Sequence, residues 1–455
     1  MMTKILKFID LFAGIGGFHI ALDRLGHKCV FASELSDELR VLYQENFKMK
    51  CHGDITKIDI KNIPSHDILC AGFPCQTFSK AGNQKGMQEA RGKLFDEILK
   101  ILSYHKPRYF ILENVRNLLT HDEGNTWEYI SKELEKLGYY FDKKILSPHY
   151  INIPQHRERI FIVGSLNSFE IQNVEWINKE SYYTSIDNIL NHSEIETDLE
   201  PEKIKVLNVW QEFINDLPPN LDPYRPLWSM EFGATYPLDI DWQNLSLIEW
   251  QKYKGNYGYS LALCNSIEDV FNHLPNYVKT QKGIPPKWKQ NYIKNNRDFY
   301  KNNKKFIKPV ILNAIKSFKQ ESWKKFEWNC KGLNRDFNNK LIQFRGSGVR
   351  IKRDDYLPSL VTVSTQIPII GKYMRYLLIE EGARAQSLPK YIKLPNTRSA
   401  SFRVLGNMVN VELVYRVAST LLNSSKKNVI SEINVDEHGN ECSQKVKRPS
   451  SQIAV

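Results

Sequence analysis

Residues 5–25 restrict the fold of this chain more than any other segment, because a glycine-rich turn there joins a predicted strand to a predicted helix. The apolar run Ile5–Phe12 predicts a strand, and Phe18–Leu25 predicts a helix. Between them the chain reads Asp10-Leu-Phe-Ala-Gly-Ile-Gly-Gly-Phe18. Glycines in that position let the backbone approach a nucleotide-like ligand beside a helix N-terminus. The lack of a Gly-Lys-Ser sequence argues against a P-loop, and a purely structural turn explains the glycines equally well.

Short apolar runs continue to alternate with amphipathic runs through the first 165 residues. This alternation is typical of an α/β fold with a mostly parallel sheet. We predict further strands at Cys29–Ser33, His66–Ala71, Arg108–Leu112 and Arg159–Val163, and helices at Phe95–Tyr104 and Trp127–Leu137.

The chain has 455 residues, which is too many for one compact core of ordinary size. Periodicity weakens near Ser165, where Asn, Lys, Tyr and Trp become frequent. Apolar periodicity returns at Tyr373–Leu388 and at Phe402–Leu422, and we expect the second run to be a helix that packs back on the first domain. The expected organisation is a first domain at 1–165, a second at 166–372, a return segment at 373–422 and a disordered tail at 423–455.

The charge of the chain is distributed unevenly. The formal net charge is +12, and Lys279–Lys325 alone holds fourteen basic residues against two acidic ones. Aromatic residues interleave with these cations, a composition that suits contacts with nucleic acid, although a solvated basic face is the alternative. By contrast, Glu170–Glu249 holds sixteen acids and four bases, and we expect it to face solvent or a protein partner. The candidate nucleic-acid contacts are Lys287, Lys289, Lys304, Lys305 and Lys308.

Composition excludes several classes of protein. Hydrophobic residues make up 42% and charged residues 25% of the chain, as in ordinary globular proteins. We find no uninterrupted apolar run of about 18 residues, so a membrane protein is not expected. The seven cysteines include no Cys-x-x-Cys pair, so we predict neither a disulfide framework nor a bound metal. A reducing cytoplasm fits this cysteine usage.

Two polar motifs follow predicted strands, so they should meet at the carboxyl edge of the sheet, and a third leads into a predicted strand. Cys75 lies in the turn Gly72–Ser79, where a thiol activated by positive charge or a helix N-terminus is a nucleophile. Glu113 ends a strand, and a partly buried carboxylic acid can donate a proton to a ring nitrogen. Arg157 and Arg159, two residues apart, should point the same way if they lie on a strand, and they can then hold a carbonyl or a phosphate. Taken singly, each motif is explained more simply as a buried cysteine, a solvated acid or a solvated charge run.

Two further acids complete a possible nucleotide site. Glu34 lies eighteen residues after Gly16, at the end of the next predicted strand, where an acid can accept from two ribose hydroxyls. Asp54 follows the next segment and can accept from an adenine amine.

The order of these motifs resembles that of the cytosine-C5 DNA methyltransferase family. Arg91–Phe95 fits the same order, Arg375–Pro389 is similar to the ninth sequence block of that family, and Phe402–Val409 is similar to the tenth. The resemblance covers roughly residues 5–165 and 341–422. Residues 166–340 match no pattern and occupy the place of the variable target-recognition domain.

The resemblance implies a Rossmann-like sheet that binds S-adenosylmethionine and transfers its methyl group to C5 of a cytosine flipped out of duplex DNA. Cys75 would attack C6 of the ring, Glu113 would hydrogen-bond N3 and the exocyclic amine, and Arg159, with Arg157 as a second candidate, would hold O2 or the adjacent phosphate. The glycine-rich segment Ser79–Lys93 would be a mobile loop that closes over the base. The cofactor residues carried over are Phe12, Ile15, Gly17, Glu34, Asp54, Pro74, Leu94 and Asn407.

Two positions depart from the family pattern. Met408 stands where serine is common, which puts a cofactor hydrogen bond in doubt, and Leu378-Ile379 stands where Thr-Pro is common. The length suggests a bacterial or phage modification enzyme of a restriction-modification system, acting as a monomer in the cytoplasm, with a cognate endonuclease as a candidate partner. The alternatives are a tRNA cytosine-C5 methyltransferase, a catalytically silent DNA-binding regulator on the same scaffold, and, with little weight, a cysteine hydrolase.

Overall fold

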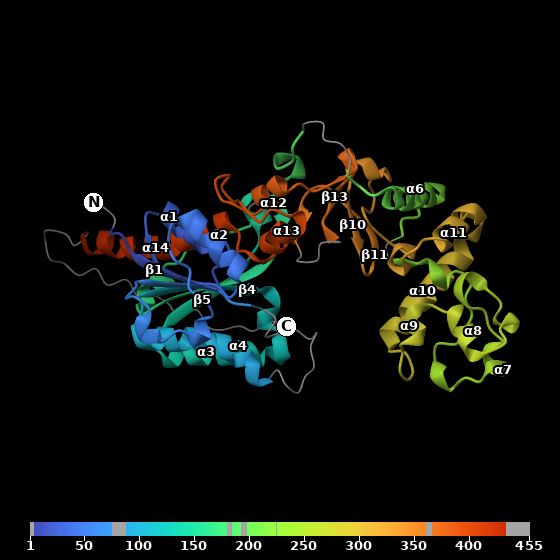
Figure 1. The fold of residues 1–455 in the computed structure, drawn as a ribbon, viewed down its shortest axis with the longest axis horizontal. Coiled ribbons are helices and arrows are strands. Elements are labelled where there is room, and N and C mark those ends of the chain that lie inside the picture. The colour runs from blue at the N-terminus through green and yellow to red at the C-terminus, as the bar shows by residue number, and fades with distance from the viewer. Residues whose placement is uncertain are drawn as a thin grey trace, which may run out of the picture.

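A computed structural model describes residues 4–74, 88–179, 184–192, 198–223, 225–360 and 366–433. Two lobes lie side by side along the longest axis of the molecule (Figure 1). The first lobe holds a six-stranded sheet with helices on both faces, and the second holds another six-stranded sheet that leads to a group of short helices. No helix among the described residues is long and apolar enough to cross a membrane.

The first sheet has the strand order β2-β1-β3-β4-β7-β5. The first four strands in this order are parallel, whereas β7 pairs antiparallel with both β4 and β5. The predicted α/β sheet is therefore present, although β5 escaped prediction because its charged middle faces solvent at the edge of the sheet. The strands are β1 (Lys7–Leu11), β2 (Lys28–Ser33), β3 (Ile68–Gly72), β4 (Tyr109–Val115), β5 (Tyr140–Leu146) and β7 (Arg159–Ser165).

Alternate residues of the strands supply two separate hydrophobic cores. Phe8 and Ile111 belong to the core on the α1 side, whereas their neighbours Ile9 and Leu112 belong to the core on the α3 and α4 side. Figure 1 shows these two helical layers above and below the sheet. Of the segment expected to be a mobile loop, residues 88–93 begin a helix instead, and residues 75–87 lie outside the described part. The helices of this part are α1 (Gly17–Arg24), α2 (Asp37–Phe47), α3 (Gln88–His105), α4 (Asn125–Lys136) and α5 (Ser168–Gln172).

The C-terminal segment returns to the first sheet through α12 (Ile379–Ala385), α13 (Arg398–Asn407) and α14 (Val411–Ile433), and α14 packs against α1. The single helix predicted at 402–422 is wrong. Asn410 interrupts it, because its side chain accepts from the amide of Leu413 and so caps a new helix. Helix α14 also runs to Ile433, beyond the expected start of the tail at 423, and residues from 434 onward lie outside the described part.

The second sheet has the order β14-β13-β10-β11-β9-β8. Its strand β14 (Arg375–Tyr376) falls beyond the expected domain boundary at residue 372. A short parallel pair, β6 (Gln155–His156) with β12 (Leu357–Pro358), joins the two lobes. The other strands are β8 (Leu227–Trp228), β9 (Lys325–Asn329), β10 (Leu341–Arg345), β11 (Gly348–Lys352) and β13 (Ile369–Ile370).

Helix α6 (Pro201–Asp216) packs against α11, and its Trp210 stacks on Phe326 of the second sheet. The remaining helices follow β8 in the chain. A separate core holds part of this helical group together and includes Trp242, Trp250 and Ile293. Helices α7, α8 and α11 lie at the end of the molecule away from the first sheet (Figure 1). These helices are α7 (Leu247–Trp250), α8 (Ile267–Asn272), α9 (Asn276–Lys279), α10 (Lys287–Asn303) and α11 (Pro309–Lys316).

Candidate active site

The carboxyl ends of the parallel strands bring the predicted motifs to one edge of the first sheet. Gly72, the last residue of β3, is in register with Glu113 on β4. Because β7 runs in the opposite direction, its first residue, Arg159, lies at the same edge and pairs with Val115. In open α/β sheets this edge is where ligands bind.

Glu113 is a buried acid beside a cation. Its Oε1 lies 3.2 Å from Nε of Arg159, and the residue is 7% exposed. Oε1 makes no hydrogen bond of good geometry within the described part of the chain. Burial raises the pKa of Glu113, and the charges of Arg159 and then Arg157 oppose that shift. The carboxyl group is therefore protonated more easily than that of a glutamic acid in solvent.

The proposed nucleophile, Cys75, lies outside the described residues. The structure does show how the segment before it is fixed. The side-chain amide of Asn114 donates to the carbonyl of Phe73 at 3.1 Å, which ties the chain after β3 to the end of β4. Sequence reasoning missed Asn114 as a positioning residue, because an amide beside the more conspicuous Glu113 gives no signal of its own.

The glycine loop is bound directly to Glu34. The amide of Gly14 donates to Oε2 of Glu34 at 2.9 Å, and the amide of Ser36 donates to Oε1 at 2.9 Å. An ionised carboxylate has about four acceptor sites, so two remain for a ligand. Gly14 has φ +56°, and a Cβ there would meet nothing within 4 Å. Phe12 adopts φ 56°, an uncommon backbone conformation for a bulky residue that is often found at functional sites.

The other predicted cofactor residues surround this loop or approach it from other segments. Asp54 uses Oδ1 to accept from the amide and the hydroxyl of Thr56. Leu35, directly after Glu34, is 72% exposed, which makes it a candidate apolar contact that sequence reasoning missed. The remaining positions differ in exposure: Ile15 is buried, Leu94 is half-buried on α3, and Pro74 and Asn407 are exposed.

The turn between α13 and α14 packs against the glycine loop, although the two segments are far apart in the sequence. A Cβ on Gly17 would lie 2.6 Å from Cγ2 and 3.1 Å from the carbonyl oxygen of Val409. A Cβ on Gly72 would lie 3.5 Å from Cγ1 of the same valine. Only a residue without a side chain leaves room for this approach at position 17. Met408, which departs from the family pattern, is buried in the same turn.

Arg157 and Arg159 occupy different surroundings, although the sequence suggested that they point the same way. Arg159 faces Glu113 and donates from Nη1 to the carbonyl of Glu158 at 2.8 Å. Arg157 is 2% exposed and donates to the carbonyls of Gly406 and Met408. Burial, followed by the charge of Arg159, lowers the pKa of Arg157 to about 9.

The predicted nucleic-acid lysines lie in the helical part of the second lobe. Lys287, Lys304 and Lys305 are exposed, whereas Lys289 donates to Gln281 and Lys308 forms an ion pair with Asp216 at 2.7 Å. Lys304, Lys305 and Lys308 lie between α10 and α11, in the helical part that lies beyond the second sheet (Figure 1).

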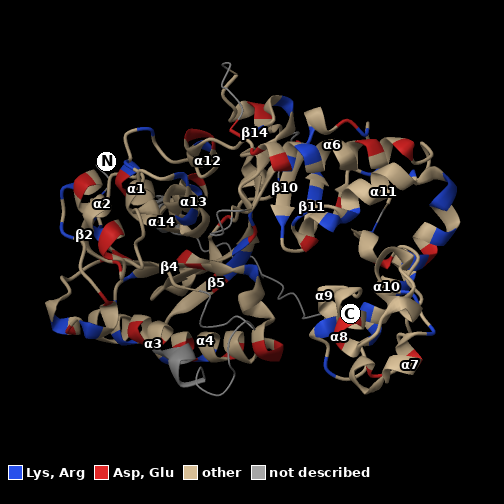
Figure 2. Cartoon of the chain, turned by 45° about the vertical axis from the view of Figure 1, so that its right-hand side comes forward, with Lys and Arg blue, Asp and Glu red and all other residues tan. Residues whose placement is uncertain are grey.

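A second group of cations lies on the second sheet, and sequence reasoning missed it. The strands β9 and β11 alternate buried apolar residues with polar ones, so one face of the sheet is polar. Figure 2 shows Lys and Arg residues on these strands as well as beside α10 and α11. Arg350 is bound through two hydrogen bonds to Glu327, whereas burial and the charge of Arg350 lower the pKa of Arg345. The cations of this polar face are Lys325, Arg345, Arg350 and Lys352.

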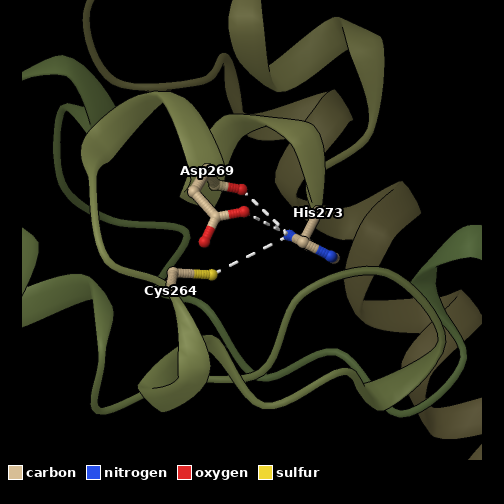
Figure 3. A group of neighbouring side chains, drawn as sticks. All are labelled: Cys264, Asp269 and His273. Carbon is tan, nitrogen blue, oxygen red and sulfur yellow. Dashed lines mark hydrogen bonds and ion pairs between the residues drawn. The ribbon is translucent and has the colours of Figure 1, made fainter.

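Cys264, Asp269 and His273 form a further cluster, on and before α8 (Figure 3). All three contacts converge on Nδ1 of His273, which donates to the carbonyl of Asp269 at 2.9 Å. Oδ2 of Asp269 in turn accepts from the amide of Asn265. Because Nδ1 donates this hydrogen bond, it carries a proton and has no lone pair for a metal. We therefore interpret the cluster as a cap of α8.

Comparison with known proteins agrees with this geometry. The family model described as C-5 cytosine-specific DNA methylase matches residues 6–224. The type II methyltransferase M.HhaI of Haemophilus parahaemolyticus is 44% identical over 192 residues, which are 42% of this chain and 59% of that protein. The type II methyltransferase M.AluI of Cellulosimicrobium cellulans is 29% identical over 485 aligned residues, which cover 90% of this chain and 91% of that protein.

A crystal structure of a prophage-encoded E. coli protein, described as a DNA modification methyltransferase, has a similar fold. Its TM-score is 0.51 at 17% identity, and the match covers 92% of this chain and 99% of that one. The chain therefore shares the α/β fold of that protein, with a second lobe beside the one that holds the first sheet. Residues 6–224 thus match the sequence model of the cytosine-C5 DNA methyltransferase family, and the chain is similar to curated type II methyltransferases. The alignment with M.HhaI spans about three fifths of the length of that relative.

Proposed function

We propose that this chain transfers a methyl group from S-adenosylmethionine to C5 of a flipped cytosine in a specific duplex DNA sequence, as the modification enzyme of a restriction-modification system. The observation that carries the proposal is the juxtaposition of Glu113 and Arg159 at the sheet edge that Gly72 and Phe73 also reach, in a chain that matches the sequence model of this family. A pyrimidine ring with an acceptor, an amine and a carbonyl on one edge needs such a pair of groups.

The cofactor site is supported by the loop between β1 and α1. Glu34 retains acceptor capacity for the two ribose hydroxyls, and Gly14 leaves open space where its Cβ would be. Asp54 has a second carboxylate oxygen for an adenine amine. Leu35 supplies an exposed apolar surface for the adenine ring. S-adenosylmethionine, when bound there, supplies an electrophilic methyl group.

The residues of the chain activate the cytosine. The thiolate of Cys75 adds to C6 and forms a carbon–sulfur bond, which makes C5 nucleophilic. Glu113 stabilises the ring by hydrogen bonds at N3 and the exocyclic amine, and Arg159 holds O2. The methyl group would reach C5 as its bond to the sulfonium sulfur breaks, with S-adenosylhomocysteine as the leaving group. C5 then loses its proton to a base, and the bond between Cys75 and C6 breaks by elimination. The enzyme returns to its starting state with 5-methylcytosine as product.

The second lobe is the proposed site of sequence recognition. Cations on the polar face of its sheet and on its helices suit the phosphates of duplex DNA. Base edges are read by side chains that reach into a groove, and their identity decides the recognised sequence.

The test is tritiated methyl transfer to mixed genomic DNA, with a tRNA pool in parallel and Cys75→Ser as the control. Label in 5-methylcytosine of DNA that disappears in the variant is the expected result. Label only in tRNA would assign the enzyme to the RNA-modifying branch of the family. No label in either pool, with DNA still bound, would indicate a silent DNA-binding regulator.

A further inference from the structure

The buried guanidinium of Arg157 joins segments that are far apart in the sequence. Its Nη1 donates to the carbonyl of Gly406 at 2.8 Å and to Oγ of Ser359 at 3.3 Å, and its Nη2 donates to the carbonyl of Met408 at 2.9 Å. Its backbone amide donates to Oγ of Ser147 at 2.9 Å. Each terminal nitrogen thus donates to the chain itself, whereas Nε has no hydrogen-bond partner among the described residues.

The carbonyls that Arg157 binds belong to the end of α13. The last carbonyls of a helix lack partners within the helix and carry the negative end of its dipole. A planar guanidinium can donate to two of them at once, whereas the point charge of a lysine cannot reproduce that fork. Between the two bound carbonyls lies Asn407, whose side chain is exposed.

The turn that follows α13 is in contact with the cofactor loop. Val409 packs so closely on Gly17 and Gly72 that a Cβ on Gly17 would lie 2.6 Å from it. A shift of this turn would therefore move both the wall of the cofactor loop and the exposed side chain of Asn407.

We propose that Arg157 is a positioning residue of the cofactor site, which fixes the turn Asn407–Asn410 against the glycine loop, and that Arg159 alone of the two arginines contacts the base. The inference rests on the proposed function and gives its two arginines different tasks. Arg157 acts through the turn and touches neither the cytosine nor the phosphate.

Calorimetric titration with S-adenosylhomocysteine, without DNA, tests this proposal on the full chain. Arg157→Lys is expected to weaken binding by about tenfold, which is about 1.4 kcal/mol. The matched variant Arg159→Lys is expected to bind the cofactor product as the wild type does and to lose kcat instead. Equal affinity of Arg157→Lys and wild type would overturn the proposal. A wild type that does not bind at all would count against the proposed function itself.

A double-mutant cycle with Asn407→Ala separates positioning from a general loss of structure. If Arg157 acts through the turn, the combined loss of cofactor affinity is smaller than the product of the two single losses. Additive losses would contradict it. Should Arg157→Lys fail to fold, Ser359→Ala removes one contact and leaves both carbonyl bonds. Because Oγ of Ser359 helps to orient the guanidinium, that variant is expected to raise KM for S-adenosylmethionine by less than is expected for Arg157→Lys, at unchanged kcat, and a loss of kcat at unchanged KM would overturn the proposal.

Discussion

The close approach of Val409 to Gly17 gives a quantitative prediction for Gly17→Ala. The added Cβ would lie 2.6 Å from Cγ2 of Val409, whereas carbon atoms in good contact are about 3.5–4.0 Å apart. The turn must therefore retreat by about 1 Å. The backbone carbonyl of Val409 lies 3.1 Å away, so a change of side-chain rotamer alone does not relieve the contact. Overpacking of this kind costs about 1–3 kcal/mol.

The assay has two parts, because the turn packs on the loop that we propose to bind the cofactor. Thermal unfolding should show the lost stability, and titration with S-adenosylhomocysteine should show weaker binding. Gly26→Ala is the control: its φ is +82° and its Cβ would meet nothing within 4 Å. It should cost about 1–2 kcal/mol of backbone strain without changing cofactor affinity. Wild-type affinity in Gly17→Ala would refute the reasoning, since it would mean that the turn does not constrain the loop.

Three further predictions concern the chemistry and the DNA. Cys75→Ser should abolish methyl transfer and leave DNA affinity intact, and transfer near the wild-type rate would exclude this thiol as the nucleophile. Burial raises the pKa of Glu113, so the stability that its protonated form contributes is complete below the unfolded pKa and is lost as pH rises through the folded value. Glu113→Gln should flatten that pH dependence in chemical denaturation and lower kcat, and an unchanged pH profile would contradict the assignment. Neutralising Lys304 and Lys305 should lower the log–log salt slope of DNA binding by roughly one unit per lost phosphate contact. An unchanged slope, with a reduced slope in Arg345→Gln, would place the DNA on the second sheet instead.

Much of the first lobe follows from local pattern. The strands β1, β2, β3, β4 and β7 and the helices α1, α3 and α4 begin and end within a few residues of their predicted bounds, except that α3 begins seven residues early. These elements are buried on one or both faces, so their apolar periodicity is strong. Strand β5 lacks that signal, because it lies at an edge where Asp142, Lys143 and Lys144 interrupt the pattern.

The break between α13 and α14 shows where local pattern is insufficient. Apolar residues continue at helical spacing across 402–422, so periodicity alone predicts one helix. The chain instead turns at Met408–Asn410, because the side chain of Asn410 caps the second helix and Arg157 binds the carbonyls at the end of the first. Arg157 lies some 250 positions away in the sequence, and no local rule reveals that contact.

By itself the sequence determined the family resemblance, the order of the strands along the chain and the residue types at their carboxyl ends. Those properties depend on short-range periodicity and on motifs that keep their spacing. Only the tertiary structure decided which residues of these motifs contact one another. Glu113 and Arg159 became a pair because an antiparallel strand places Arg159 at the same sheet edge, whereas Arg157, two residues earlier, is bound by the returning turn. The register of a strand and the partners of a helix's last carbonyls both depend on which distant segment packs there. Local sequence pattern therefore does not predict them.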